Sequence, residues 1–130
     1  MRRVFSVTVV AAAIVMLIAG TSSVAGARPG VGNLKYGSVG PGVKCVQVAY
    51  NVLAGQGLAT DGVYLDLTRQ ATVNWQTFFG LKVDGIVGPI TGESIQGIWD
   101  FRFGSGSWKN QWVQWKGVSF RCWGVVPSQT

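Results

Sequence analysis

The sequence predicts a mainly α-helical fold, a bundle of three short helices with ordered loops followed by a tryptophan-rich C-terminal extension. Apolar residues recur at helical spacing in three segments. Asp-Gly and Gly-Pro pairs, which are typical of turns, separate those segments. From Gly104 onward the helical spacing ends and tryptophans gather. The extension is therefore expected to differ in local structure from the bundle.

The first helix is predicted to follow Gly40-Pro41-Gly42 and to end at Gly55. Its apolar residues fall on two faces, one with Val43, Val46, Tyr50 and Leu53, the other with Cys45, Val48 and Val52. A helix that is apolar on two sides has to be covered on two sides. The other helices can cover only one of them, so the second face is predicted to meet the C-terminal extension.

The remaining two helices are predicted from the spacing of their apolar residues and from the threonine and glycine residues at their ends. The second is expected to start near Thr68, whose side chain can cap the first turn, and to end at Gly80. The third is expected to start near Thr91. The residues expected to face the core are Ala71, Trp75 and one of Phe78 and Phe79 from the second helix, and Ile95, Ile98 and Trp99 from the third.

The loops ahead of these two helices repeat one pattern. The first carries Asp61, Gly62 and Thr68, and the second carries Asp84, Gly85 and Thr91, each 23 positions later. Glycine in an Asp-Gly turn allows a positive φ, and Gly88-Pro89 enforces a bend before the third helix. The chain is therefore predicted to repeat a turn-then-helix unit.

The extension is predicted to form a β-hairpin, with strands over 112–115 and 118–122 around the two-residue turn Lys116-Gly117. The face expected to be buried has Val113, Trp115, Val118, Phe120 and Cys122, and the outer face has Trp112, Gln114, Ser119, Arg121 and Trp123. Short tryptophan-rich segments can also be helical, so that alternative stays open.

The N-terminus is predicted to be a secretory signal peptide spanning residues 1–27. It has a short basic start, an uncharged apolar stretch over 4–19 and the small-x-small pattern Ala25-Gly26-Ala27. A membrane anchor is the alternative, but the apolar stretch is shorter than the roughly 20 residues that a spanning helix needs. We expect a helical domain over 28–103, an extension over 104–130 packed on the same core, and no membrane contact after cleavage.

The net charge and the two cysteines indicate what kind of surface the protein has and whether its environment is oxidising. The formal net charge is +6, of which Arg2 and Arg3 contribute two, leaving a mild basic bias of +4 from residue 28 onward. This is a mild bias and not a patch, so no nucleic-acid partner is expected. Such a surface would be drawn to an anionic polymer, but many soluble secreted proteins carry the same charge, so the charge alone does not decide the function. A secreted chain with Cys45 and Cys122 as its two cysteines is expected to join them in a disulfide. Two buried free thiols are the alternative.

The residues needed for catalysis are scarce. The chain has no histidine, which excludes a histidine-bearing zinc site and any nucleophile with an imidazole base. Its five carboxylates include Asp61 and Asp84 in glycine turns, where a carboxylate commonly binds its own backbone, and Glu93, expected in the first turn of a helix. We therefore expect no enzyme activity, no metal and no cofactor.

The segment Val83-Asp84-Gly85-Ile86-Val87-Gly88-Pro89, with Val46-Gln47, Asp61-Gly62 and Trp75-Gln76 upstream, resembles the small three-helix peptidoglycan-binding module of bacterial cell-wall hydrolases over about residues 34–98. The resemblance implies a targeting domain without catalysis that holds its host on the wall glycan or its stem peptides. The candidate ligand contacts are Tyr64, Gln76 and Asp84 in the module and Trp112 and Trp123 in the extension, where an exposed indole can stack on a sugar.

The residues and the resemblance leave three functions to consider. The first is a secreted, wall-associated, non-catalytic protein that binds peptidoglycan, with the extension as a cover or a second contact surface. The second is an exported protein-interaction module, an inhibitor or partner subunit that keeps the fold without wall binding. The third, a wall hydrolase, is disfavoured because the chain has no histidine.

Overall fold

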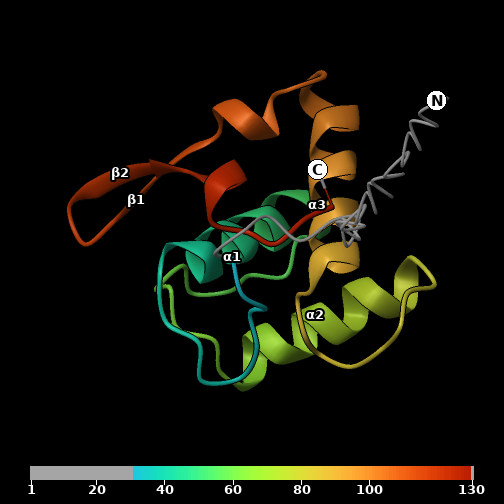
Figure 1. Ribbon diagram of the computed structural model, residues 1–130. Coiled ribbons are helices and arrows are strands. Elements are labelled where there is room, and N and C mark those ends of the chain that lie inside the picture. Colours follow the sequence, from blue (N-terminus) through green and yellow to red (C-terminus); the bar gives the residue numbers. More distant parts are fainter. Residues whose placement is uncertain (1–30, 130) are drawn as a thin grey trace, which may run out of the picture.

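The computed structural model describes residues 31–129, and the core of this part is built from three α-helices (Figure 1). Their bounds are Pro41–Ala54 for α1, Asp66–Phe78 for α2 and Pro89–Phe103 for α3. The predicted mainly α-helical, three-helix fold is confirmed. The predicted signal peptide lies outside the described residues.

Two of the helices, α1 and α3, begin at a proline and are followed by a glycine. Pro41 and Pro89 occupy the first turns of α1 and α3, where a missing N–H costs nothing. Gly55 ends α1 in the left-handed conformation, with φ of 61°, as its position in the sequence predicted. All three helices start two residues earlier than expected. Thr68 does not cap α2, because its hydroxyl accepts a hydrogen bond from the Gln47 side chain instead.

The core lies where the three helices meet. Its buried helical residues include Val43, Val46, Tyr50, Ala71, Trp75, Ile95 and Trp99, as the spacing predicted. The Trp75 ring lies 5.5 Å from the Tyr50 ring and 4.6 Å from the Phe79 ring. Of the two phenylalanines that end α2, Phe79 packs on the core and Phe78 is 81% exposed.

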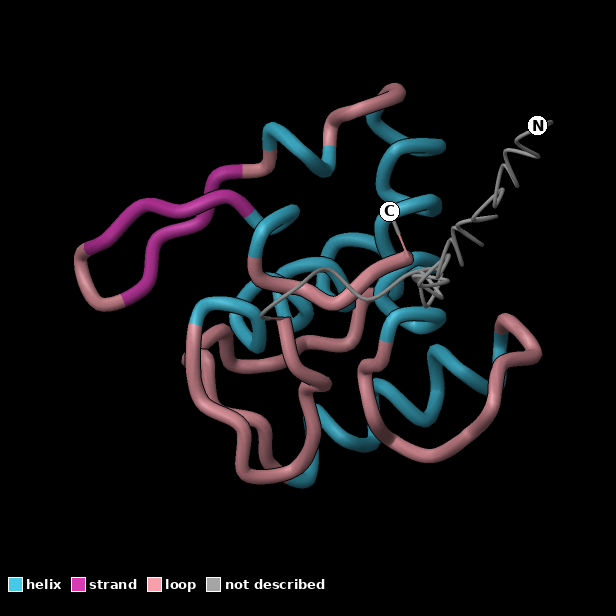
Figure 2. Tube along the Cα trace, in the orientation of Figure 1, coloured by secondary structure: helices cyan, strands magenta, loops and turns pink. Residues whose placement is uncertain are grey.

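The segment over residues 34–40, just before α1, pairs with both Asp-Gly loops. Leu34 pairs with Val87 in the loop before α3, and Val39 pairs with Val63 in the loop before α2. Figure 2 shows these ordered loops threading between the helices. One short extended segment thus fixes both Asp-Gly loops relative to each other.

The predicted hairpin is confirmed. After the 3-10 turn η1 (Trp108–Asn110), β1 (Trp112–Trp115) pairs antiparallel with β2 (Val118–Arg121), and Trp115 lies opposite Val118. Lys116 and Gly117 have φ of 51° and 77°, as a tight two-residue turn requires. The hairpin projects beyond the helices (Figure 1), so Val118 is 62% exposed and the expected inner face is buried only in part. Cys122 begins a second 3-10 turn, η2 (Cys122–Gly124).

The extension is fastened to α1 and α3 by a covalent bond and by close backbone packing. Cys45 and Cys122 form the predicted disulfide, with Cα atoms 5.6 Å apart. Gly42 and Gly92 let the last segment approach: a Cβ on Gly42 would collide with the Val125 carbonyl oxygen, and one on Gly92 with the Pro127 carbonyl oxygen. The second apolar face of α1 therefore meets the extension at Cys45, as expected, but Val52 on the same face stays 41% exposed.

In the described part of the chain, no helix combines the length and apolarity needed to cross a membrane.

Candidate functional site

Each Asp-Gly loop is built around one buried glutamine. In the first loop, the Gln47 amide nitrogen on α1 donates to Asp61 Oδ1 (3.1 Å), the Val63 carbonyl oxygen (3.0 Å) and Thr68 Oγ1 (3.1 Å). Its amide oxygen accepts from the Gly62 N–H at 2.9 Å. One side chain therefore links the turn, the following segment and the start of α2.

Gln76 on α2 makes the same set of bonds in the second loop. Its amide nitrogen donates to Asp84 Oδ1 (2.9 Å), the Ile86 carbonyl oxygen (2.9 Å) and Thr91 Oγ1 (3.1 Å). Its amide oxygen accepts from the Gly85 N–H at 2.9 Å. Every partner of Gln47 has a counterpart at Gln76, which confirms the predicted repeat, and Gln76 also accepts from the Asp84 N–H at 3.1 Å.

The backbone of the two loops matches as well. Gly62 and Gly85 have φ of 73° and 69°, so each turn uses the left-handed conformation that glycine allows. Asp61 Oδ1 accepts from the Val63 N–H at 3.0 Å, and Asp84 Oδ1 accepts from the Ile86 N–H at 2.9 Å. Both carboxylates bond their own loop, as expected from their place in a glycine turn.

A groove lies beside each loop, of about 290 Å³ at the first and about 380 Å³ at the second. Eight positions that line one groove correspond, at the repeat spacing, to eight that line the other. The pair Leu67 and Ile90 keeps an exposed aliphatic side chain in both grooves. The charge differs, because Asp66 lines the first groove and Lys82 the second. The module therefore has two grooves whose lining positions correspond but whose charges differ.

Hydrogen bonding and burial shift the pKa values around the loops. The Val63 N–H, and next the Gln47 amide, lower the pKa of the Asp61 carboxyl. Burial raises the pKa of Tyr64 to about 12, and burial also raises the pKa of Tyr50. The Tyr64 hydroxyl oxygen lies 2.6 Å from Thr72 Oγ1 and 2.8 Å from the Gly85 carbonyl oxygen. Tyr64 thus joins α2 to the second Asp-Gly turn.

Of the three predicted ligand contacts in the module, Tyr64 and Gln76 lie inside the scaffold, whereas Asp84 is exposed. Tyr64 has no exposed surface, so its ring offers no face to a ligand in this structure. Gln76 is 1% exposed, and its amide is taken up by the second loop. Asp84 lines the second groove, but one of its carboxylate oxygens already serves the Gln76 amide and the Ile86 N–H. Their positions explain why the fold needs these residue types.

Sequence reasoning missed the role of Gln47. It lies between Val43 and Tyr50 on the apolar face of α1 and is 1% exposed. A polar residue on a core-facing stripe is the signal that could have found it, since a buried amide must have partners. On α2, Thr68, Thr72 and Gln76 form a similar polar line at four-residue spacing.

The predicted contacts in the extension are exposed. Trp112 is 57% exposed, with the Arg121 guanidinium 4.7 Å from its ring centre. Trp123 is 38% exposed, with the Lys109 amino group 5.3 Å from its ring centre. The hairpin and the loop between α2 and α3 occupy separate parts of the molecule (Figure 1), so these indoles are not brought together with Gln76 and Asp84. Their ligand role stays a prediction.

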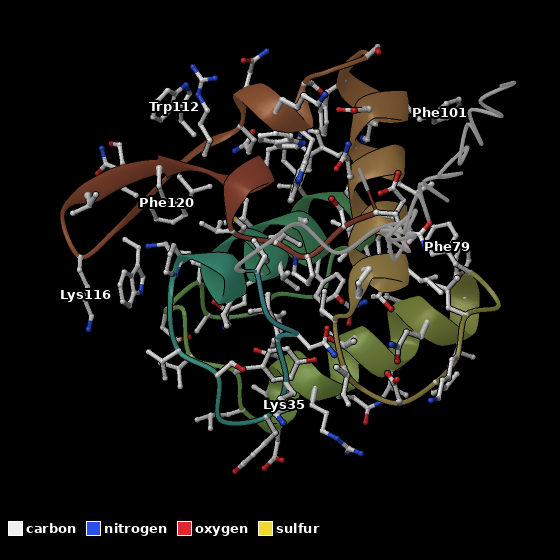
Figure 3. The ribbon with its side chains drawn as sticks, viewed as in Figure 1. Lys35, Phe79, Phe101, Trp112, Lys116 and Phe120 are labelled. Atoms are coloured by element: carbon white, nitrogen blue, oxygen red, sulfur yellow. A yellow bond between two sulfur atoms is a disulfide. The ribbon has the colours of Figure 1, made fainter. Side chains whose placement is uncertain are left out.

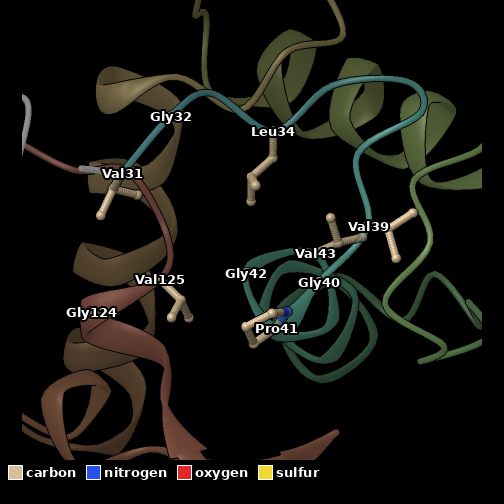
Figure 4. Close-up of a pocket in the computed structure, with 10 residues that line it drawn as sticks. All are labelled: Val31, Gly32, Leu34, Val39, Gly40, Pro41, Gly42, Val43, Gly124 and Val125. Atoms are coloured by element: carbon tan, nitrogen blue, oxygen red, sulfur yellow. The ribbon is translucent and has the colours of Figure 1, made fainter. Parts of the chain in front are cut away.

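Two further pockets lie at other places on the bundle. One, of about 260 Å³, opens between the start of α1 and the last segment, and its lining is aliphatic side chains, glycine and proline (Figure 4). The other, of about 340 Å³, lies against the ends of α1 and α2 and is lined mostly by apolar groups, including Trp75, Phe78 and Phe79. Within residues 31–129, no three histidine, cysteine or acidic side chains gather where they could hold a metal ion.

Comparison with known proteins identifies the helical part. Residues 40–95 match the model of the family described as "Putative peptidoglycan binding domain". A zinc D-Ala-D-Ala carboxypeptidase of Streptomyces albus G is 37% identical over 53% of this chain and 28% of its own length. An uncharacterised protein encoded in the bpoA1 3′ region of Kitasatospora aureofaciens is 47% identical over 40% of this chain and 45% of its own.

The matched segments cover less than half of either relative, and all of these similarities concern only part of this chain. The crystal structure of the SleB N-terminal domain is 30% identical, covers 49% of this chain and 88% of its own, and has a TM-score of 0.48. The family match contains both Asp-Gly turns and the two glutamines that hold them. Residues 40–95 therefore match the peptidoglycan-binding domain that the sequence resembles.

Proposed function

We propose that this chain is a non-catalytic, secreted bacterial protein that binds cell-wall peptidoglycan through its helical module. The observation that carries the proposal is the pair of corresponding grooves beside the Asp-Gly loops, both inside the family match. Peptidoglycan is a repeating polymer, and two grooves of similar frame on one rigid bundle suit neighbouring units of such a ligand. Leu67 and Ile90 give each groove an exposed apolar contact.

The absence of catalysis in this proposal is supported by what the polar groups already do. Asp61 and Asp84 are bonded to their own loops, and the lowered pKa of Asp61 keeps its carboxylate ionised. A glycosidase needs a carboxylic acid that still holds its proton at working pH. The chain also lacks histidine, so it has no imidazole general base.

The first test is sedimentation of the protein from residue 28 onward with insoluble peptidoglycan stripped of anionic polymers. We expect it to pellet at low and high salt and to release no soluble fragments, because specific contacts survive the screening that removes ionic attraction. Release of fragments would contradict the absence of catalysis. If the protein stays in the supernatant at both salt concentrations, wall binding by the module is wrong.

The second test asks whether the grooves make the contact. Leu67→Ser and Ile90→Ser together should weaken the salt-resistant binding by about tenfold, since two exposed apolar contacts are lost. Val83→Ser is the matched control, because Val83 is 52% exposed in the second loop but does not line its groove. Equal binding by the double variant and the control would remove the grooves from the proposal.

A protein-interaction module is the second candidate, and the apolar pocket at the end of α2 favours it. Phe78 lines this pocket, packs edge-on against Phe79 and is 81% exposed, so a bound partner would have apolar surface to cover there. If sedimentation fails, affinity capture from culture medium with Phe78→Ser as the paired bait should distinguish this function. A partner lost with Phe78→Ser and retained with Val83→Ser would support it.

A further inference from the structure

The unbalanced positive charge of the described chain belongs to its C-terminal extension. Between residues 31 and 103, five lysines and arginines are balanced by five acidic residues, so this part is formally neutral. Residues 104–129 add Lys109, Lys116 and Arg121 and contain no aspartate or glutamate. Lysines and arginines occur along the whole described chain, but only those of the extension lack acidic residues in their own segment.

The same extension offers two exposed indoles beside two of these cations. Arg121 lies over Trp112, and Lys109 lies over Trp123. A guanidinium stacked on a ring uses its flat face, which leaves the N–H edges able to donate to an anion. Each pair therefore combines an apolar ring surface with a positive charge.

The strand register places polar groups next to the Trp112–Arg121 pair, on the side toward the hairpin turn. Trp112 lies opposite Arg121, and Gln114 lies opposite Ser119, and all four side chains are exposed. Figure 3 shows Trp112 pointing away from the helices and Phe120 on the side toward α1. We use the name indole face for these four outward strand side chains together with the Lys109–Trp123 pair in the two 3-10 turns that flank the hairpin.

We propose that the indole face is a second binding site, for an anionic sugar polymer. A flat indole stacks on the apolar face of a sugar ring, and amide and hydroxyl groups hydrogen-bond sugar hydroxyls. Lysine and arginine would pair with the phosphate, sulfate or carboxylate groups of the same polymer. The chain carries this positive surface outside residues 40–95, so the site is separate from the peptidoglycan-binding module.

The arrangement favours a polymer over a lipid bilayer. A surface that enters a membrane is apolar on the side that inserts, with charged groups at the boundary. On the indole face, Gln114 and Ser119 form one of the two outward cross-strand pairs of the hairpin. Burying them in lipid would cost free energy, whereas a sugar polymer would satisfy their hydrogen bonds.

Matched soluble polymers test the proposal without peptidoglycan, so its failure is separate from failure of the module. We expect tryptophan fluorescence titration to show binding of dextran sulfate that exceeds binding of neutral dextran and of polyglutamate, an anionic chain without sugars. Binding should weaken with salt but remain tighter for dextran sulfate than for polyglutamate. Vesicles of phosphatidylglycerol and phosphatidylcholine in equal parts should bind less than dextran sulfate.

Variants locate the site. Lys109→Gln with Arg121→Gln should weaken dextran sulfate binding by about tenfold, since two exposed ion pairs are lost. Arg102→Gln is the matched control, because Arg102 is an exposed arginine beside a ring, Phe103, but lies on α3. Trp112→Leu should weaken binding of dextran sulfate by about fivefold and leave binding of polyglutamate unchanged. Melting curves would confirm that each variant is folded.

Three results would overturn the proposal. Equal binding of polyglutamate and dextran sulfate would mean plain charge attraction without sugar recognition. Stronger binding to the vesicles than to any polymer would assign the surface to lipid. An equal loss for the Arg102 control and the hairpin variants would show that the hairpin is not the site.

Discussion

Each Asp-Gly loop depends on one buried glutamine, because a carboxamide offers donors and an acceptor in one planar group. Gln76 uses both ends of its amide and connects residues from Asp84 to Thr91. An aliphatic residue of similar size would fill the space, but it would leave the Gly85 N–H and the Thr91 hydroxyl without this partner. The cost of such a change is therefore the loss of the loop, not of one contact.

We predict that Gln76→Ala lowers the free energy of unfolding by about 2–4 kcal/mol, since buried loop groups lose their partner and a cavity remains. Urea unfolding followed by tryptophan fluorescence would measure the change. Gln70→Ala on the same helix is the control, because Gln70 is exposed and its side chain bonds the exposed Asn74, and its effect should stay within about 0.5 kcal/mol. Equal losses for the two variants would contradict the scaffold role.

Tyr64 predicts a loss of stability at alkaline pH. Its pKa is raised from 10.0 to about 12 in the folded protein, so above pH 10 the unfolded chain gives up the proton while the folded chain keeps it. The stability contributed below pH 10 is therefore lost as the pH rises toward 12. Urea unfolding between about pH 9 and about pH 11 would show the decline.

Tyr64→Phe should be less stable at neutral pH, because the bonds to Thr72 and the Gly85 carbonyl are lost, but its alkaline decline should be shallower. Tyr36→Phe serves as the control, since the Tyr36 ring is 56% exposed. An alkaline slope that is the same in all three proteins would rule out Tyr64 as its source.

At the scale of helices and strands, the sequence predicted the features that depend on neighbouring residues. Gly55 at the end of α1, the Lys116-Gly117 turn and the pairing of Trp115 with Val118 all follow from neighbouring residues. Thr68 and Tyr64 did not follow, because their partners Gln47 and Gly85 are 21 residues away in each case. Which side of a loop an aromatic residue faces depends on such distant partners.

The contact between α3 and the final segment should reverse the usual effect of a glycine-to-alanine substitution on stability. Alanine usually stabilises a helix relative to glycine by about 0.5–1 kcal/mol, and Gly97→Ala should show this gain because nothing lies near its added Cβ. Gly92→Ala should instead destabilise the protein, because its Cβ would meet the Pro127 carbonyl oxygen. Thermal melting of the two variants is the measurement, and a gain at both positions would disprove the close packing.

At the scale of the whole molecule, the Cys45–Cys122 disulfide closes a loop with a sequence separation of 77. In the chain-entropy model such a loop contributes about 4 kcal/mol by restricting the unfolded state. We predict that reduction lowers the urea midpoint accordingly, and that mass spectrometry of the non-reduced protein shows two hydrogens fewer than the dithiol. Alkylation of both cysteines in the untreated native protein would contradict the bond.

If the helical module and the hairpin were bound to two ligands at once, the same disulfide would determine how a pulling force is transmitted between them. A force on the hairpin would enter at Cys122, directly after β2, and pass through a covalent bond to Cys45 on α1. It would not have to be borne by the apolar contacts between the extension and the bundle. Under tension between two wall polymers, the bundle and the hairpin would therefore separate only after α1 itself had been pulled out of the core.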